Sequence, residues 1–171
     1  SKNLKNKVNK DLKTIKKKNK NFSNFYFNNN PNIMGILNLT PDSFSDGGKF
    51  NKKSLAKKQI TSLMKSGSNI IDIGGESTRP GSKKINQKLE WKRIEYILKK
   101  FGKKFPLSLD TRKSEIMSKG IKKGIKLIND ISGLQYDKQT IMVLKKSNIP
   151  FVIHHMQGTP KNMQLNPRYR N

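Results

Sequence analysis

Short apolar runs and longer helix-spaced segments alternate along the chain from Pro31 onward. The apolar runs cover residues 33–39, 69–73, 107–109, 127–131 and 151–153. Between them, apolar residues recur at helical spacing within 54–64, 89–101, 114–121 and 140–144. Runs this short predict buried strands, and strands that alternate with helices predict βαβ units and a parallel sheet. We therefore expect an α/β fold in which all strand C-termini lie along one edge.

Each predicted strand ends in polar side chains. The first strand ends at Asn38, the third at Asp110, and the fourth at Asn129 and Asp130. The second runs into the segment Glu-Ser-Thr-Arg-Pro-Gly at 76–81, and the fifth into residues 154–157. Binding sites lie at the carboxyl ends of parallel strands in barrels and in open sheets alike, so we expect these groups to surround one site.

These strand ends allow both a ligand-binding and a structural interpretation. Asp110 could accept paired N–H bonds from a heterocycle, or it could cap the helix that follows. Asn129 carries a donor and an acceptor that suit the edge of a base-like ring, but Asn129 and Asp130 could instead form an Asx turn. Thr78 and Arg79 could hold an anion or belong to a tight surface loop. The residue types alone leave these alternatives open.

The first 30 residues differ from the rest of the chain. They are rich in Lys and Asn, and Leu4, Val8, Leu12 and Ile15 recur at helical spacing, which predicts a basic amphipathic helix. The segment is either a plain N-terminal appendage or a targeting or membrane-surface element. We therefore expect a basic N-terminal extension at 1–30, followed by one domain at 31–171.

Charge and composition narrow the class of protein. The net charge is +26, but only five of the 37 basic residues are Arg, and Lys is spread over every inter-strand segment. Bidentate contacts to phosphates and base edges favour Arg, so we expect a solvated surface and no specific nucleic acid partner. The absence of Cys excludes disulfides and cysteine zinc sites. No run approaches the ~20 apolar residues of a membrane span, and no apolar signal core is visible, so we expect a cytoplasmic protein.

Two long blocks resemble the signatures of one enzyme family. GILNLTPDSFSDGG at 35–48 resembles the first signature of dihydropteroate synthase, and IIDIGGESTRPG at 70–81 resembles the second. SLDTRK, LINDISGL and HHMQGTPKNMQ resemble its next three strand ends in the same order. The resemblance implies a (β/α)8 TIM barrel and a transferase of folate biosynthesis. Such an enzyme condenses 6-hydroxymethyl-7,8-dihydropterin diphosphate with 4-aminobenzoate to give dihydropteroate and diphosphate, and sulfonamides inhibit it.

The resemblance also implies a diphosphate and metal region. Asn38 would bind the Mg2+ that accompanies the diphosphate, which makes magnesium the expected cofactor. Thr78 would contact the diphosphate side of the substrate. A first mobile loop that closes over the diphosphate would include Thr40, Asp42, Ser43, Phe44, Ser45 and Asp46.

A second set of implied roles concerns the two organic substrates. Asp110 and Asn129 would read the pterin ring and are the residues expected to carry catalysis. Met156 would lie near the pterin. Arg79 and Pro80 would help to form the aminobenzoate pocket.

The match covers only the first part of a barrel. About five βα units fit into the sequence, and the later family motifs, which include a Ser-Arg-Lys and an Arg-x-His segment, are absent from it. We therefore expect the N-terminal portion of a barrel, with little activity and marginal stability alone, and full-length members that form homodimers. A pterin-binding methyltransferase domain is the alternative. It would share the Asp110 and Asn129 contacts, but it has no diphosphate to hold.

Overall fold

The computed structural model describes residues 2–16, 21–22, 25–26, 31–40, 52–77, 82–155, 157 and 168. The chain divides into two compact units, Ser1–Pro31 and Asn32–Asn171. Among the described residues, no helix is both long and apolar enough to cross a membrane.

The first unit contains one helix and one small hairpin. Helix α1 covers Lys2–Lys16, which confirms the predicted basic helix, and its apolar side chains Leu4, Val8 and Leu12 are exposed. Strands β1, Asn21–Phe22, and β2, Phe25–Tyr26, pair antiparallel. The sequence pattern did not predict this hairpin, because two-residue strands are too short to show a period.

The second unit alternates strands and helices as predicted. The five strands are β3 (Met34–Asn38), β4 (Ile70–Gly74), β5 (Leu107–Asp110), β6 (Leu127–Asp130) and β7 (Phe151–Ile153). The four helices between them are α2 (Lys52–Lys65), α3 (Gln87–Phe101), α4 (Ser114–Lys122) and α5 (Thr140–Ser147). The strands form one parallel sheet in the order β3-β4-β5-β6-β7.

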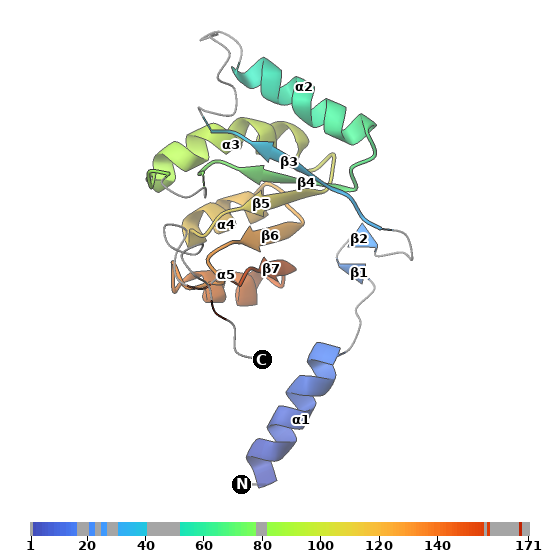
Figure 1. Cartoon of the computed structure of the whole chain (residues 1–171), viewed down its shortest axis with the longest axis vertical. Helices are drawn as coiled ribbons and strands as arrows, with labels where there is room; N and C mark the ends of the chain where they lie inside the picture. Colours follow the sequence, from blue (N-terminus) through green and yellow to red (C-terminus); the bar gives the residue numbers. More distant parts are fainter. Residues whose placement is uncertain are drawn as a thin grey trace. The chain divides into compact units, whose positions relative to one another are not determined.

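The strand order determines which face the helices cover. Each strand is added on the same side of the previous one, so right-handed crossovers place every helix on one face, as in a barrel (Figure 1). Strand β3 alternates accordingly: Gly35 and Leu37 are buried, whereas Met34, Ile36 and Asn38 are exposed. The buried core gathers strand residues such as Ile73 and Leu109 with helix residues such as Ile60, Ile94 and Ile116.

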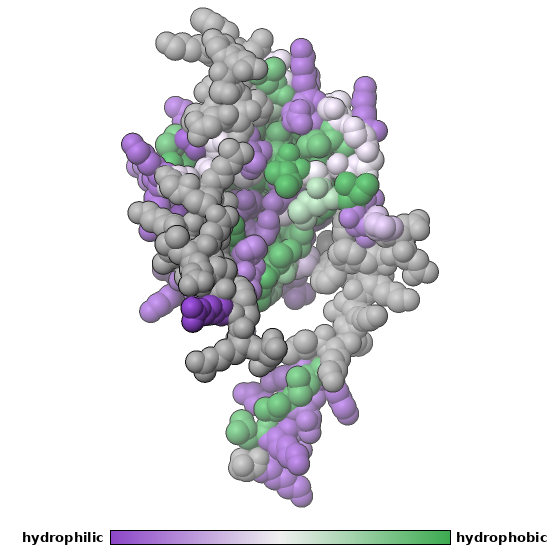
Figure 2. All heavy atoms as spheres, viewed as in Figure 1, coloured by the Kyte–Doolittle hydropathy of each residue, from purple (hydrophilic) through white to green (hydrophobic). Residues whose placement is uncertain are grey.

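The opposite face of the sheet, here called the inner face, is open among the described residues. Three of its apolar side chains are exposed: Met34 by 39%, Ile36 by 64% and Val152 by 42%. Figure 2 shows apolar residues gathered over the strands and bordered by polar ones. Buried apolar surface drives folding, so an open inner face is an incomplete core.

Candidate functional site

Three of the predicted site residues share one row across the sheet. The strand register pairs Asn38 with Gly74, Gly74 with Asp110, and Asp110 with Asn129. Residues paired in this way point to the same face, which here is the inner one. The row lies at the carboxyl ends of β3 to β6, so Asn38, Asp110 and Asn129 come together from segments far apart in the sequence.

Gly74 leaves a gap in the middle of this row. A Cβ atom at Gly74 would lie 3.3 Å from Asn38 Oδ1 and 3.4 Å from Asp110 Oδ2. Both oxygen atoms therefore point over the glycine from its two sides. A side chain at this position would occupy the space between the amide and the carboxylate, and glycine keeps that space open.

Asp72 forms a second polar layer beneath the row. Its Oδ2 atom accepts a hydrogen bond from Asn129 Nδ2 at 2.9 Å, which fixes the orientation of that amide. Burial raises the pKa of the Asp72 carboxyl, and the side chains of Ser108 and Asn129 oppose the rise. Asp72 Oδ1 and Ser108 Oγ are buried without a hydrogen-bond partner among the described residues. Asp72 and Ser108 are paired in the strand register, so these two buried side chains lie next to each other beneath the row.

Asp110 carries the most perturbed carboxyl of the described residues. Burial raises its pKa to about 7, and the negative charges of Asp72, Glu90, Asp130 and Glu76 add to the rise. Its carboxylate has no hydrogen-bond partner in the described part of the chain. A carboxyl that is half-buried, unpaired and directed over Gly74 is suited to accept N–H groups from a ligand.

Asn129 and Asp130 have separate roles, although they are neighbours in the sequence. Asn129 faces the row, whereas the fully buried Asp130 accepts hydrogen bonds from the Ser132 N–H and hydroxyl and from the Leu134 N–H. This turn holds Leu134 at a φ of 66°. The Asx-turn interpretation therefore applies to Asp130 and leaves Asn129 available to the site.

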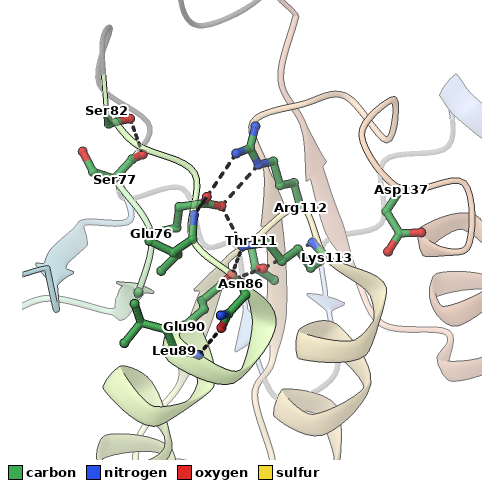
Figure 3. Close-up of polar contacts among 12 residues, drawn as sticks. Glu76, Ser77, Ser82, Asn86, Leu89, Glu90, Thr111, Arg112, Lys113 and Asp137 are labelled. Atoms are coloured by element: carbon green, nitrogen blue, oxygen red, sulfur yellow. Dashed lines mark hydrogen bonds and ion pairs between the residues drawn. The ribbon is translucent and has the colours of Figure 1, made fainter.

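A buried ionic cluster lies at the end of β4 and β5 (Figure 3). We name it the Glu76 cluster, and it consists of Glu76, Glu90, Thr111, Arg112 and Lys113. Lys113 Nζ lies 2.9 Å from Glu76 Oε2 and 2.5 Å from Glu90 Oε2. The sequence did not predict this cluster. One signal was available: Glu90 falls on the same helical stripe as Ile94, Ile97 and Leu98, where a charge needs a buried partner.

The structure tests the capping alternative for Asp110. Helix α4 begins at Ser114, its N-cap residue Lys113 provides no side-chain cap, and the Ser114 N–H donates to Asp137 Oδ2 at 2.9 Å. Asp110 therefore does not cap this helix, which removes the structural alternative for this residue.

Several predicted site residues lie outside the described residues. These are Asp42, Ser43, Phe44, Ser45, Asp46, Thr78, Arg79, Pro80 and Met156. Thr40 is described, and it is buried two residues after β3. In the described ranges, no three His, Asp or Glu side chains gather into a metal site. Asn38 is exposed at the edge of the row, where one amide oxygen could join the water and phosphate ligands that Mg2+ prefers.

Comparisons with known proteins point to one family. The family described as pterin binding enzyme matches residues 34–171. The dihydropteroate synthase of Neisseria meningitidis serogroup C is 44% identical over 143 residues, which are 82% of this chain and 50% of the relative. That of Escherichia coli K12 is 40% identical over 141 residues, 81% of this chain and 50% of the relative. The chain thus spans about half the length of these curated relatives.

Solved structures agree with the partial-barrel prediction. A Yersinia pestis dihydropteroate synthase in a sulfonamide drug complex matches with a TM-score of 0.74 at 40% identity, covering 82% of this chain and 52% of that one. A Xanthomonas albilineans dihydropteroate synthase with 4-aminobenzoic acid matches with a TM-score of 0.70 at 35% identity, covering 75% of this chain and 48% of that one. The predicted α/β fold is confirmed.

Proposed function

The chain belongs to the pterin binding enzyme family, and from this membership we propose that it forms the N-terminal half of a dihydropteroate synthase. The synthase would join 6-hydroxymethyl-7,8-dihydropterin diphosphate to 4-aminobenzoate in folate biosynthesis. The relatives named above are all synthases, and this favours the synthase over the methyltransferase alternative. The same proposal includes a cytoplasmic location and a homodimeric full-length protein.

The observation that carries the proposal is the row of Asn38, Gly74, Asp110 and Asn129. An Asp110 carboxylate over a gap at Gly74 can accept two N–H groups from the amino-amidine edge of a pterin. The Asp72 bond uses one N–H of the Asn129 amide and orients it, so its oxygen can face the ring. Recognition by paired, preoriented polar groups gives specificity for one heterocycle edge.

The reaction would transfer the pterin methylene carbon from oxygen to nitrogen. The C–O bond to diphosphate breaks and its electron pair leaves with the diphosphate. The amine of 4-aminobenzoate forms the new C–N bond and then releases a proton. Positive charge develops on the pterin side, and a carboxylate at Asp110 stabilises it.

The proposal assigns the remaining predicted residues to the other substrate groups. Asn38 would hold Mg2+, which would neutralise charge on the departing diphosphate. Thr78 would contact the diphosphate. Arg79 and Pro80 would help to form the aminobenzoate pocket, where sulfonamides would compete with 4-aminobenzoate. Met156 would pack near the pterin. The 40–46 loop would exclude water from the reactive carbon.

Replacing Asp110 tests the proposal. The variants are made in a full-length barrel, obtained by joining residues 1–171 to the second half of the Neisseria relative. We expect Asp110→Asn to weaken pterin diphosphate binding at least tenfold, since a charge-assisted hydrogen bond is worth about 1.5–3 kcal/mol. Glu115→Gln, which changes an exposed residue of α4, is the matched control. Unchanged pterin affinity in a folded Asp110→Asn protein would contradict the assigned role.

A further inference from the structure

The Glu76 cluster includes the three residues that follow Asp110 and is not part of the substrate contacts proposed above. Its two carboxylates are almost fully buried, Glu76 with 7% and Glu90 with 0% exposure, and Lys113 is 4% exposed. Buried ion pairs often stabilise a fold no better than apolar residues of the same size would. Two carboxylates and a lysine buried beside a strand end, with Arg112 at their border, therefore point to a purpose other than stability.

Glu76 collects hydrogen bonds from two distant parts of the chain. The N–H of Ile85 donates to Glu76 Oε1 at 3.0 Å, and Arg112 donates through Nη2 at 3.1 Å and Nε at 3.3 Å. Lys113 Nζ adds a bond to Glu76 Oε2 at 2.9 Å. Burial alone would raise the pKa of Glu76, but these donors outweigh it and lower the pKa. The residue is an ionised junction between β4, the segment at 82–85 and the residues after β5.

The three residues after Asp110 are all held by the two carboxylates. Thr111 Oγ1 donates to Glu90 Oε1 at 2.6 Å, Arg112 binds Glu76, and Lys113 bridges Glu76 and Glu90. The N–H of Thr111 also donates to the Asn129 carbonyl at 3.1 Å. The backbone that leaves Asp110 is thereby tied to β6, to the end of β4 and to helix α3.

Arg112 is fixed from its other side as well. Its guanidinium lies 4.0 Å from the centre of the Tyr136 ring, so it is stacked while it donates to Glu76. Figure 3 shows Arg112 and Lys113 converging on Glu76 from the segment after β5. A short segment with this many directed contacts has little freedom to shift, which is the condition for a well-placed neighbouring ligand group.

We infer that Glu76 is a positioning residue that, through Arg112 and Lys113, sets the place of Asp110 in the inner-face row. The inference rests on the proposed pterin-binding role of Asp110. It assigns to Glu76 no contact with the substrate.

Amide hydrogen exchange in the 171-residue chain tests the local effect. Glu76→Gln keeps the size of the side chain and removes the charge that binds Arg112 and Lys113. We expect the amides of Thr111 and Lys113, which both donate hydrogen bonds, to exchange about tenfold faster, while Leu109 in β5 keeps its protection. Unchanged exchange at Thr111 and Lys113, or faster exchange throughout the unit, would overturn the inference. Glu115→Gln, which breaks an exposed pair with Lys119, should change neither region.

Pterin affinity in the full-length barrel tests the functional effect. At a temperature where circular dichroism shows a folded protein, Glu76→Gln should raise the Kd for the pterin diphosphate about tenfold. If the cluster is purely structural, Glu76→Gln should lower the melting temperature and leave this Kd unchanged. That result would refute the positioning role. If the parent barrel binds no pterin, the proposed function fails, whereas the exchange experiment still decides whether Glu76 holds residues 111–113.

Discussion

Asp110 and the residues that follow it make contacts on opposite sides of the sheet. Asp110 belongs to the inner-face row, while Thr111 and Lys113 bind Glu90 of α3 on the helical side. The carboxyl of Asp110 has no described partner of its own, so its pKa rises to about 7 through burial and the charges of nearby carboxylates. An unpaired carboxyl with a raised pKa lowers the stability of the fold near neutral pH but can bind a ligand. Such groups are common at functional sites.

This state of Asp110 predicts a specific pH dependence of stability. Its folded pKa of about 7 lies above the ordinary aspartate value of 3.8, so the folded state binds an extra proton between these values. The contribution of Asp110 to stability therefore falls as pH rises through this window. Between pH 5 and 8, we expect the parent chain to lose about 3 kcal/mol relative to Asp110→Asn.

Urea unfolding of the two proteins at pH 5, 6, 7 and 8 measures this difference. The comparison of parent and variant removes the contributions of titrating groups that do not interact with Asp110. Parallel pH profiles for the parent and Asp110→Asn would show that the Asp110 pKa is not raised.

At the scale of elements, helices α3 and α4 differ in how their N-termini are capped. A residue next to the helix caps α3, whereas a residue from a distant segment caps α4. Helix α3 has a local cap, since Asn86 Oδ1 accepts the N–H of Leu89 at 2.9 Å. Helix α4 has none, and Asp137, which precedes α5, accepts the Ser114 N–H instead. Asp137 also accepts the N–H of Gln139, so one carboxylate joins two successive helix starts.

Removing this shared cap should cost more than removing a local one. We expect Asp137→Ala to lower the free energy of unfolding by about 2 kcal/mol, and Asn86→Ala by about 1 kcal/mol. Urea unfolding at pH 7 compares the two variants. Equal losses would mean that Asp137 contributes to only one helix.

At the scale of the whole second unit, the sequential strand order places the helices of its described part, α2 to α5, on the face opposite the inner one. The part of the solved relatives that matches this chain makes up about 50% of their length. The polar row and the exposed Met34, Ile36 and Val152 lie together on this face, so site and incomplete core occupy the same surface. The expected low activity and marginal stability of the 171-residue chain alone stay predictions.

Neighbouring residues of β3 test this description. Leu37 faces the helices and is 2% exposed, whereas Ile36 faces inward and is 64% exposed. In the 171-residue chain, Leu37→Ala should cost about 2–5 kcal/mol, but Ile36→Thr should change stability by only about 0.5 kcal/mol. In the full-length barrel, Ile36→Thr should become clearly destabilising. Equal costs for Ile36→Thr in both proteins would show that this face is not covered by the second half.

The sequence by itself determined the alternating elements, the family resemblance and the candidate residues at the strand ends. These follow from local periodicity and from the rule that parallel strands end at one edge. The roles proposed for Asn38, Asp110 and Asn129 stay predictions, although the structure brings the three together. Only the tertiary structure decided how buried polar groups pair: Asn129 with Asp72, Lys113 with Glu76, and Ser114 with Asp137. The partners are separated by 57, 37 and 23 residues, and such pairs depend on strand register and helix packing, which no local pattern records.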